Sequence, residues 1–140
     1  KLHPIWQDLE SPLDIEQATI RALLLVQRYP LTSSPVAGIR TCEKCPLCKS
    51  EPETLTHFLL HCQPLQDVRD KFLPRILNTC KEYGISVDPD SIIKIILDPT
   101  HLPYKNQNHD EICRKFLYKI HTVRSVKLGG EAGYSKISKL

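Results

Sequence analysis

Apolar side chains recur every three or four residues along most of the chain, and this spacing predicts amphipathic α-helices. The clearest stripe, between about residues 64 and 83, consists of Leu65, Val68, Phe72, Ile76, Cys80 and Tyr83. A second stripe, between about residues 108 and 128, consists of Ile112, Phe116, Ile120 and Val123, flanked by Cys113 and Leu117. We expect each stretch to form a helix that buries its striped face.

A third helix is expected near the N-terminus, between Ser11 and Pro30. Ser11 is a suitable N-cap, the proline after it suits the first helical position, and Asp14 places an acid in the first turn. This helix would also bury more than one side, because its apolar sector is wide. One face consists of Ile15, Ala18, Ala22 and Leu25, and it is widened by Leu23, Leu24 and Val26. In the segment before the helix, Trp6 is expected to anchor the chain.

Two shorter helices complete the pattern. Asp88 and the proline after it begin one helix, which ends at Asp98. Its clustered isoleucines would also suit a strand, but the signals at its start favour a helix. The other short helix carries His57 and is expected to be capped by Thr54.

Proline and glycine refine these boundaries. Pro74 lies inside the stretch at residues 64–83 and is expected to kink or split that helix. Gly84, just after the stretch, is a suitable C-terminal cap. The sequence therefore predicts a mainly α fold of about five helices, forming one domain over residues 1–128.

The composition is that of an ordinary globular domain. The chain has 140 residues, of which 25% are charged and 41% hydrophobic, and this length can bury a core. It contains no methionine and begins with lysine, so we expect it to be part of a longer polypeptide. We see neither a membrane-spanning apolar run nor a signal peptide, and expect an intracellular protein of the nucleus or cytoplasm with no membrane partner. Residues 129–140 are expected to form a flexible basic tail.

Four of the six cysteines lie within the segment 42–62, and a histidine lies among them. The pattern C-x2-C-x8-H-x4-C consists of Cys45, Cys48, His57 and Cys62. Zinc binds three thiolates and one imidazole tetrahedrally, and a gap of two residues lets the first two sulfurs reach one ion. The sequence therefore predicts one structural zinc ion, and its thiolate ligands suit a reducing compartment.

Other interpretations of the cysteines remain open at this point. Cys42 could replace Cys45 or Cys48, or could complete an all-thiolate set that leaves His57 unused. His61 is a rival to His57, but it adjoins a cysteine, and neighbouring side chains on a helical turn diverge. The cysteines could also be free or disulfide-bonded.

The spacing of the last two ligands makes a structural demand. Residues five apart on a regular α-helix point about 140° away from each other. Pro64 disfavours the helical conformation at Gln63. We therefore expect the helix that carries His57 to end near Cys62, so that both side chains can reach one metal.

These residues also carry a resemblance to a known family. The run Cys45-Pro46-Leu47-Cys48, then Glu53-Thr54, then His57-Phe58-Leu59-Leu60 with Cys62, resembles the cysteine–histidine motif near the C-terminus of non-LTR (LINE-class) retrotransposon reverse transcriptases. The extra Cys42 departs from that motif.

The flanking residues extend the resemblance. Arg28-Tyr29-Pro30-Leu31 precedes the motif, and Pro64-Leu65 with Arg69 follows it, as in that family. The similarity covers roughly residues 15–125, most closely 40–75. It implies a C-terminal segment that holds template RNA or target DNA for a neighbouring reverse-transcriptase domain. No reverse-transcriptase active site is visible in this segment.

Positive charge is concentrated toward the C-terminus. Residues 112–140 contain seven Lys or Arg against one acid, a local net charge of +6 in a chain whose formal net charge is +3. Such an imbalance favours phosphate contacts, although a solvated helix face would give the same pattern. The expected nucleic-acid-binding residues are Arg114, Lys115, Lys119, Arg124 and Lys127. Three further basic residues surround the cysteines, and they could contact phosphates or simply balance the charge of the metal centre. They are Arg40, Lys44 and Lys49.

No catalytic motif accompanies the metal motif. Four protein ligands leave no coordination position for water, which argues against a catalytic zinc. Pro89-Asp90 could begin a restriction-like endonuclease motif, but no later acid-x-lysine completes it. We therefore expect no enzymatic activity and no small-molecule substrate. The favoured function is a zinc-stabilised nucleic-acid-binding module, and the alternative is a protein-interaction or scaffolding domain derived from such an element.

Overall fold

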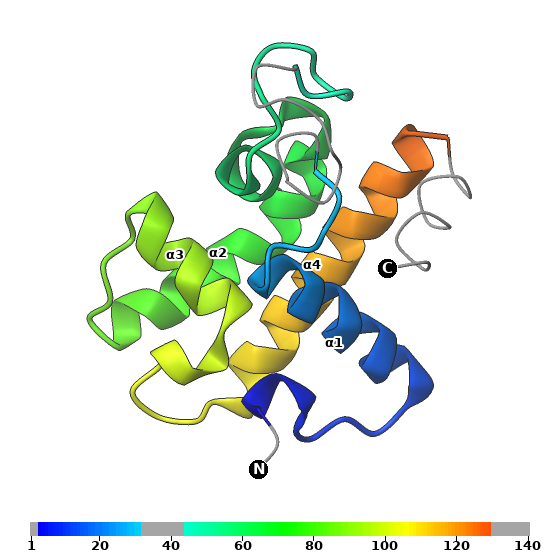
Figure 1. Ribbon diagram of the computed structural model, residues 1–140. Coiled ribbons are helices and arrows are strands. Elements are labelled where there is room, and N and C mark those ends of the chain that lie inside the picture. Colours follow the sequence, from blue (N-terminus) through cyan, green and yellow to red (C-terminus); the bar gives the residue numbers. More distant parts are fainter. Residues whose placement is uncertain (1–2, 32–43, 130–140) are drawn as a thin grey trace.

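The computed structural model of the protein describes residues 3–31 and 44–129 (Figure 1). The α-helices in these ranges are α1 (Pro12–Leu25), α2 (Gln66–Glu82), α3 (Pro89–Leu97) and α4 (Gln107–Lys127). A π-helical turn, His57–His61, precedes α2. Short 3-10 turns occur at Pro4–Trp6, Gln63–Leu65 and Pro99–His101. The predicted mainly α fold is confirmed.

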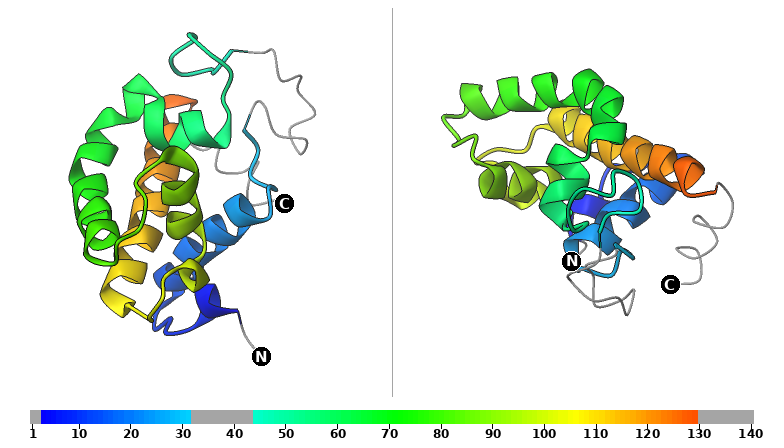
Figure 2. Two further views of the ribbon diagram at one scale, coloured as in Figure 1. Left: turned by 90° about the vertical axis from the view of Figure 1, so that its left-hand side faces the viewer. Right: turned by 90° about the horizontal axis from the view of Figure 1, so that it is seen from above.

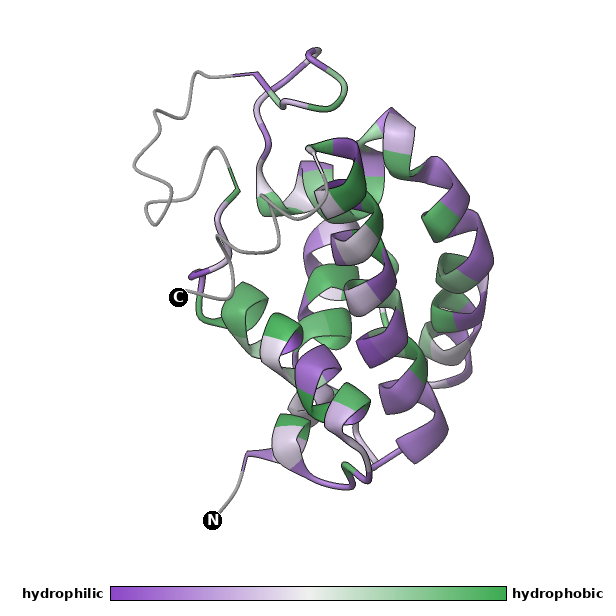
Figure 3. Cartoon of the chain, turned by 90° about the vertical axis from the view of Figure 1, so that its right-hand side faces the viewer, coloured by the Kyte–Doolittle hydropathy of each residue, from purple (hydrophilic) through white to green (hydrophobic). Residues whose placement is uncertain are grey.

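The central helix is α4. It lies between α1 and α2, and α3 contacts all three (Figures 1 and 2). The helices carry both hydrophobic and hydrophilic residues, as expected for amphipathic helices (Figure 3). The buried apolar residues of these helices and of the segment at residues 45–65 form one continuous core. The metal motif therefore shares its packing with the helices.

Side-chain caps determine where the helices begin. At the start of α1, the Ser11 hydroxyl accepts a hydrogen bond from the Asp14 backbone N–H at 3.1 Å, and the Asp14 carboxylate accepts one from the Ser11 N–H at 3.2 Å. Asp88 caps α3 and Asn106 caps α4 in a similar way. The predicted starts of these helices are correct to within one residue.

The helix α2 runs through Pro74 without a break, so the prediction that this proline could split it is wrong. Pro74 and Asp70, whose carbonyl loses its usual partner, lie on the exposed side of the helix. Water can hydrate that carbonyl, which keeps the cost of the proline low. Gly84 caps the helix with φ +67°, and Ile85 donates its backbone N–H to the Cys80 carbonyl at 2.8 Å, as the sequence predicted.

The helix α1 differs from its prediction in length and in part of its buried face. It ends at Leu25 rather than near Pro30. Ala18 and Leu24 are buried as expected, but Ile15 is 53% exposed and Val26 is 61% exposed. The side chains that α1 buries are Gln17, Ala18, Ile20, Arg21 and Leu24.

Two polar side chains on the buried face of α1 account for its difference from the predicted apolar face. Arg21 donates from Nε to the Leu97 carbonyl at 3.1 Å and forms an ion pair with Asp110. Gln17 accepts a hydrogen bond from Arg114 Nε at 3.1 Å. Buried polar groups with partners of this kind are stable, and a hydrophobicity pattern does not anticipate them.

Trp6 is not the anchor that the sequence suggested. It is 36% exposed, whereas its neighbour Ile5 is buried. None of the helices in residues 3–31 and 44–129 is long and apolar enough to cross a membrane. The expected tail lies, from residue 130 onward, outside the described residues, and the single-domain boundary stays a prediction.

Candidate metal centre

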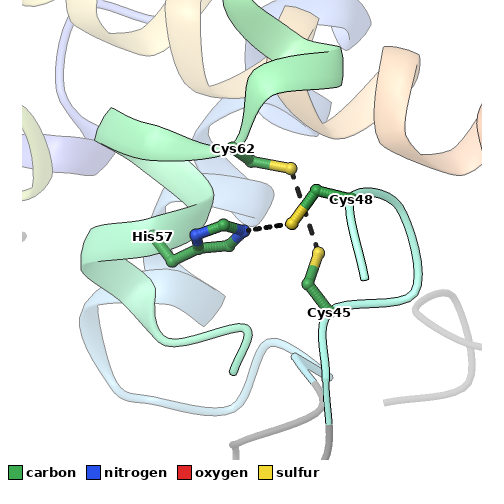
Figure 4. A group of neighbouring side chains, drawn as sticks. All are labelled: Cys45, Cys48, His57 and Cys62. Atoms are coloured by element: carbon green, nitrogen blue, oxygen red, sulfur yellow. Dashed lines mark hydrogen bonds between the residues drawn. The ribbon is translucent and has the colours of Figure 1, made fainter. Parts of the chain in front are cut away.

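The four predicted ligands lie together at one end of the bundle (Figure 4). The ligand atoms of Cys45, Cys48, His57 and Cys62 are all within 4.8 Å of one another. The Cys45 and Cys62 sulfurs are 3.9 Å apart, and the Cys48 sulfur is 3.3 Å from His57 Nε2. This group can bind one metal ion. Cys42, the alternative ligand, lies outside the described residues.

The spacing of these atoms can be compared with a tetrahedral zinc site. Zinc–sulfur and zinc–nitrogen bonds of ordinary length place two sulfurs about 3.8 Å apart and a sulfur about 3.6 Å from a nitrogen. The corresponding distances here, 3.9 and 3.3 Å, differ from those values by only a few tenths of an ångström. No two of the four ligand atoms are more than 4.8 Å apart, so the group is close to the spacing of a tetrahedral site.

The first two ligands belong to a tight turn. An isolated antiparallel bridge joins Lys44 to Pro52, and Cys45 donates its backbone N–H to the Glu51 carbonyl at 2.8 Å. Lys49 closes the turn with φ +58° and donates its N–H to the Cys45 carbonyl at 2.9 Å. These bonds hold the two sulfurs on the same side of the turn.

Backbone N–H groups also face the sulfurs of this turn. Burial raises the pKa of the Cys45 thiol, and hydrogen bonds from the backbone of Cys48 and Leu47 partly oppose that effect. Desolvation also raises the pKa of Cys48, but backbone hydrogen bonds from Ser50 and Glu51 outweigh it and bring the pKa to about 7. A thiol of this kind loses its proton to a metal readily at neutral pH.

The other two ligands come from the π-helical turn. Cys62 donates its backbone N–H to the His57 carbonyl at 2.8 Å, a bond that spans five residues instead of four. One turn of this wider helix takes more than four residues, so residues five apart lie nearly above one another. The helix ends at Cys62, as predicted, and Thr54 caps its start by accepting the His57 N–H at 3.1 Å.

One detail of the expected chain break is wrong. Gln63 was expected to leave the helical region because of Pro64, but it begins a 3-10 turn. The extended residue is Cys62, with φ −60° and ψ 117°. A break in the helix alone therefore does not account for the spacing of His57 and Cys62. A π-helical turn, which the sequence did not predict, brings the two side chains together.

A carboxylate orients the histidine ligand. Glu51 Oε1 lies 2.5 Å from His57 Nδ1, which leaves Nε2 directed at the cysteine sulfurs. Ligand histidines in metal sites usually donate their second N–H to such a partner, and this fixes the tautomer. This role of Glu51 was not predicted from the sequence, although a carboxylate six residues before the histidine was a visible signal.

Among the described residues, the structure does not support the alternatives to the predicted ligands. His61 is exposed and lies outside the group. The described cysteines, Cys45, Cys48, Cys62, Cys80 and Cys113, are all free thiols. Cys80 is fully buried on α2, as its predicted role in the core requires.

Two buried arginines lie next to the metal centre. Arg69 of α2 donates to the backbone carbonyls of Phe58 and Cys62. Arg124 of α4 binds the buried carboxylate of Glu53 through two hydrogen bonds of 2.8 Å each. The charge of Arg69 interacts with the Cys62 thiol, whereas the charge of Arg124 is paired with Glu53, which contacts Cys45.

The predicted nucleic-acid-binding face is consequently smaller than the sequence suggested. Arg124 and Arg114 are buried and ion-paired, so neither is available on the surface. Lys115 is exposed but pairs with Glu111 at 2.7 Å. Lys119 and Lys127 are exposed, and no ion pair is formed by either within the described part of the chain. Periodicity placed the basic residues on one helix but could not separate the internal from the external ones.

Comparisons of this chain with models of protein families, with curated proteins and with solved structures find no match. The interpretation of the site therefore depends on its own geometry and chemistry.

A buried histidine near the metal centre predicts a dependence of stability on pH. Burial and, to a lesser extent, the positive charge of Arg124 together lower the pKa of His121 from the usual 6.5 to about 4. As the pH falls below 6.5, the unfolded chain binds a proton that the folded chain excludes. Stability should therefore decline between about pH 6.5 and pH 4, by on the order of 3 kcal/mol in total from this group.

The measurement is urea unfolding of the parent and of His121→Gln across this pH range. Glutamine retains a hydrogen-bonding group for Tyr29, whose hydroxyl lies 2.7 Å from His121 Nδ1, but it does not titrate. Protonation of the metal ligands affects both proteins alike. The parent should lose more stability than the variant as the pH falls, and parallel curves would contradict the assignment.

Proposed function

We propose that Cys45, Cys48, His57 and Cys62 bind one structural zinc ion. The observation that carries this proposal is the convergence of three sulfurs and one imidazole nitrogen at distances that suit tetrahedral zinc. The hydrogen bond that His57 Nδ1 donates to Glu51 supports it, because it presents Nε2 to the ion. A bound ion would cross-link the turn that carries Cys45 and Cys48 to the segment that carries His57 and Cys62.

We propose further that the module is not catalytic. Structural zinc sites use four protein ligands, whereas catalytic ones keep a position for water. A full set of protein ligands is present here, and three of the four are buried. Free thiols that bind metal persist in reducing compartments, which is consistent with a nuclear or cytoplasmic protein.

We propose that the module binds nucleic acid at the metal end of the bundle. The pair formed by Arg124 with Glu53 brings the last turns of α4 beside the cysteine turn. The exposed lysines of the cysteine turn and of the C-terminal half of α4, which we call the metal-end lysines, are Lys44, Lys49, Lys119 and Lys127. Such lysines can contact successive phosphates of RNA or DNA without reading the sequence.

This proposal agrees with the resemblance to non-LTR reverse transcriptases. The resembling residues include all four members of the metal group. In that setting the module would hold template RNA or target DNA for a neighbouring reverse-transcriptase domain of the same polypeptide.

Replacing the metal-end lysines should weaken nucleic-acid binding. We expect the quadruple alanine variant at Lys44, Lys49, Lys119 and Lys127 to lose affinity for single-stranded RNA and duplex DNA of unrelated sequence. The salt dependence should also flatten, by up to roughly one unit of log–log slope per lost phosphate contact. Fluorescence anisotropy at several salt concentrations measures both effects.

A matched control uses exposed lysines elsewhere on the fold. Lys81 lies at the end of α2 and Lys94 lies on α3, and both are exposed. Their double alanine variant should bind as the parent does. If both variants bind with the affinity and salt dependence of the parent, the nucleic-acid proposal is wrong.

A protein-interaction role is the second candidate, and one observation favours it. The helix α1 and the residue after it expose three large apolar side chains, with Leu13 at 51%, Ile15 at 53% and Val26 at 61%. Exposed apolar side chains are a feature of docking surfaces when they form a contiguous patch. Weak, salt-insensitive binding of both nucleic acids by the parent would favour this role.

A further inference from the structure

We infer that the buried ion pair of Glu53 with Arg124 is a positioning pair for the metal centre. It would keep the surroundings of Cys45 compatible with a metal-bound thiolate, and it would attach the cysteine turn to α4. This inference rests on the proposed zinc site.

The pair has the geometry of a strong, specific contact. Arg124 Nε donates to Glu53 Oε2 and Arg124 Nη2 donates to Glu53 Oε1, each at 2.8 Å. Glu53 is 1% exposed and Arg124 is 5% exposed. Such a bidentate pair excludes water and has one preferred orientation. Removing one partner of a buried pair is much more costly than removing both.

The same carboxylate touches a metal ligand. The Cys45 sulfur lies 3.8 Å from Glu53 Oε2, the oxygen that also accepts from Arg124 Nε. Cysteine binds zinc as the thiolate, which has no proton to donate. A thiolate beside an unpaired buried carboxylate would be repelled, and the guanidinium of Arg124 neutralises that carboxylate. Arg124 therefore allows the Glu53 carboxylate to lie beside a metal-bound Cys45 thiolate.

Arg124 is itself fixed by residues that lead to the other ligands. Its guanidinium lies 5.5 Å from the centre of the Tyr29 ring and 5.8 Å from the centre of the Phe58 ring. It also donates to the Pro30 carbonyl at 3.4 Å. Phe58 directly follows the ligand His57 in the π-helical turn. One side chain thus connects α4, the end of the α1 segment and both halves of the metal motif.

These contacts predict an asymmetry between the metal-bound and metal-free protein. Without Arg124, the metal-free protein retains a Cys45 thiol that can donate a hydrogen bond to Glu53. The metal-bound protein has no such compensation, because the ligand is a thiolate. Loss of Arg124 should therefore reduce metal affinity, in addition to any loss of stability.

The experiment measures zinc affinity of the full chain by competition with a chromophoric chelator, and records the cobalt absorption spectrum of each variant. Arg124→Met should lower zinc affinity by about 10- to 100-fold, the usual effect of losing a residue that supports metal ligands. Glu53→Gln can still accept a hydrogen bond from Arg124 and removes the charge beside Cys45, so it should cost little affinity, and the double variant should recover most of the loss. The cobalt spectrum of Arg124→Met should change in intensity and should return toward the parent spectrum in the double variant.

Arg114→Met is the matched control. Arg114 is another buried, ion-paired arginine of α4, and its partners are Asp14, Gln17 and Asp110 rather than the metal segment. Its loss should lower the melting temperature with and without zinc by similar amounts, and should leave zinc affinity unchanged. Arg124→Lys, which keeps the charge in a smaller group, should fold and should lose less affinity than Arg124→Met.

The outcomes separate this inference from the metal site. If the parent binds no zinc, the proposed metal centre fails. If the parent binds zinc and both Arg124 variants bind it with the affinity of the parent, the pair has only a structural role. The same holds if Glu53→Gln lowers zinc affinity as much as Arg124→Met does. Either result overturns the positioning inference.

Discussion

His57→Ala should abolish zinc binding and lower the stability of the whole protein. The parent is expected to carry one zinc ion per chain, measured by elemental analysis of reduced protein. Structural zinc contributes on the order of 10 kcal/mol to zinc-finger peptides, comparable to the total stability of an ordinary domain. We expect a decrease of several kcal/mol in the free energy of unfolding, and Cys48→Ser should behave in the same way.

The extent of unfolding is set by the residues around the ligand. Phe58 and Leu59 follow His57 directly, and both are fully buried in the same core as the helices. Release of the π-helical turn should therefore open that core, and loss of amide protection should extend beyond residues 44–62 to the adjoining parts of α2 and α4. Hydrogen exchange of the parent with and without chelator measures this spread.

His61→Ala is the matched control for the metal prediction. His61 lies in the same helical turn but is exposed and outside the ligand group, so its loss should leave both zinc content and stability unchanged. Reduced parent protein without zinc would contradict the assignment. Loss of metal on Cys42→Ser, comparable to that on Cys45→Ser, would show that the ligand set itself is wrong.

Phe58→Ala should be among the most destabilising single changes in the apolar core. The Phe58 ring is fully buried, stacks on Tyr29 with ring centres 5.5 Å apart, and lies below the guanidinium of Arg124. Truncation of a buried phenylalanine costs about 3 to 5 kcal/mol through lost transfer energy and the cavity that remains. Urea unfolding in saturating zinc measures this loss while the metal site is still filled.

Two variants test the cause of that loss. Phe58→Leu, which fills most of the space, should cost less than half as much. Phe72→Ala removes a half-buried ring of α2 that packs against Phe116, so it should cost less than Phe58→Ala and leave zinc affinity unchanged. Equal losses for Phe58→Ala and Phe72→Ala would show that Phe58 has no special role in holding the metal segment.

Most of the helices and the clustering of the four candidate ligands could be predicted because their signals are local. Ser11 and Asp88 cap helices through contacts a few residues away, and the stripe on α2 needs only its own periodicity. The ligand spacing is similarly compact, since the four ligands lie within 18 residues of sequence. Local chemistry of this kind is visible without knowledge of the tertiary structure.

The errors concern residues whose roles depend on distant partners. Arg124 pairs with a residue 71 positions away, and Arg114 hydrogen-bonds to Gln17, 97 positions away. The sequence marks both arginines as basic and therefore as surface residues, because buried arginine is uncommon. The burial of Gln17 and Arg21 on α1 was missed for the same reason, since both side chains find polar partners outside that helix.

The five-residue hydrogen bond from Cys62 to His57 has a consequence for insertions and deletions. A π-helical turn is equivalent to an α-helical turn with one residue inserted. Residues four apart on an α-helix already share a face, so a chain one residue shorter between these ligands could present the same pair from a regular helix. The spacings H-x3-C and H-x4-C are thus alternative solutions for one ligand geometry. Shortening this segment by one residue would change the type of helix and need not move the ligands.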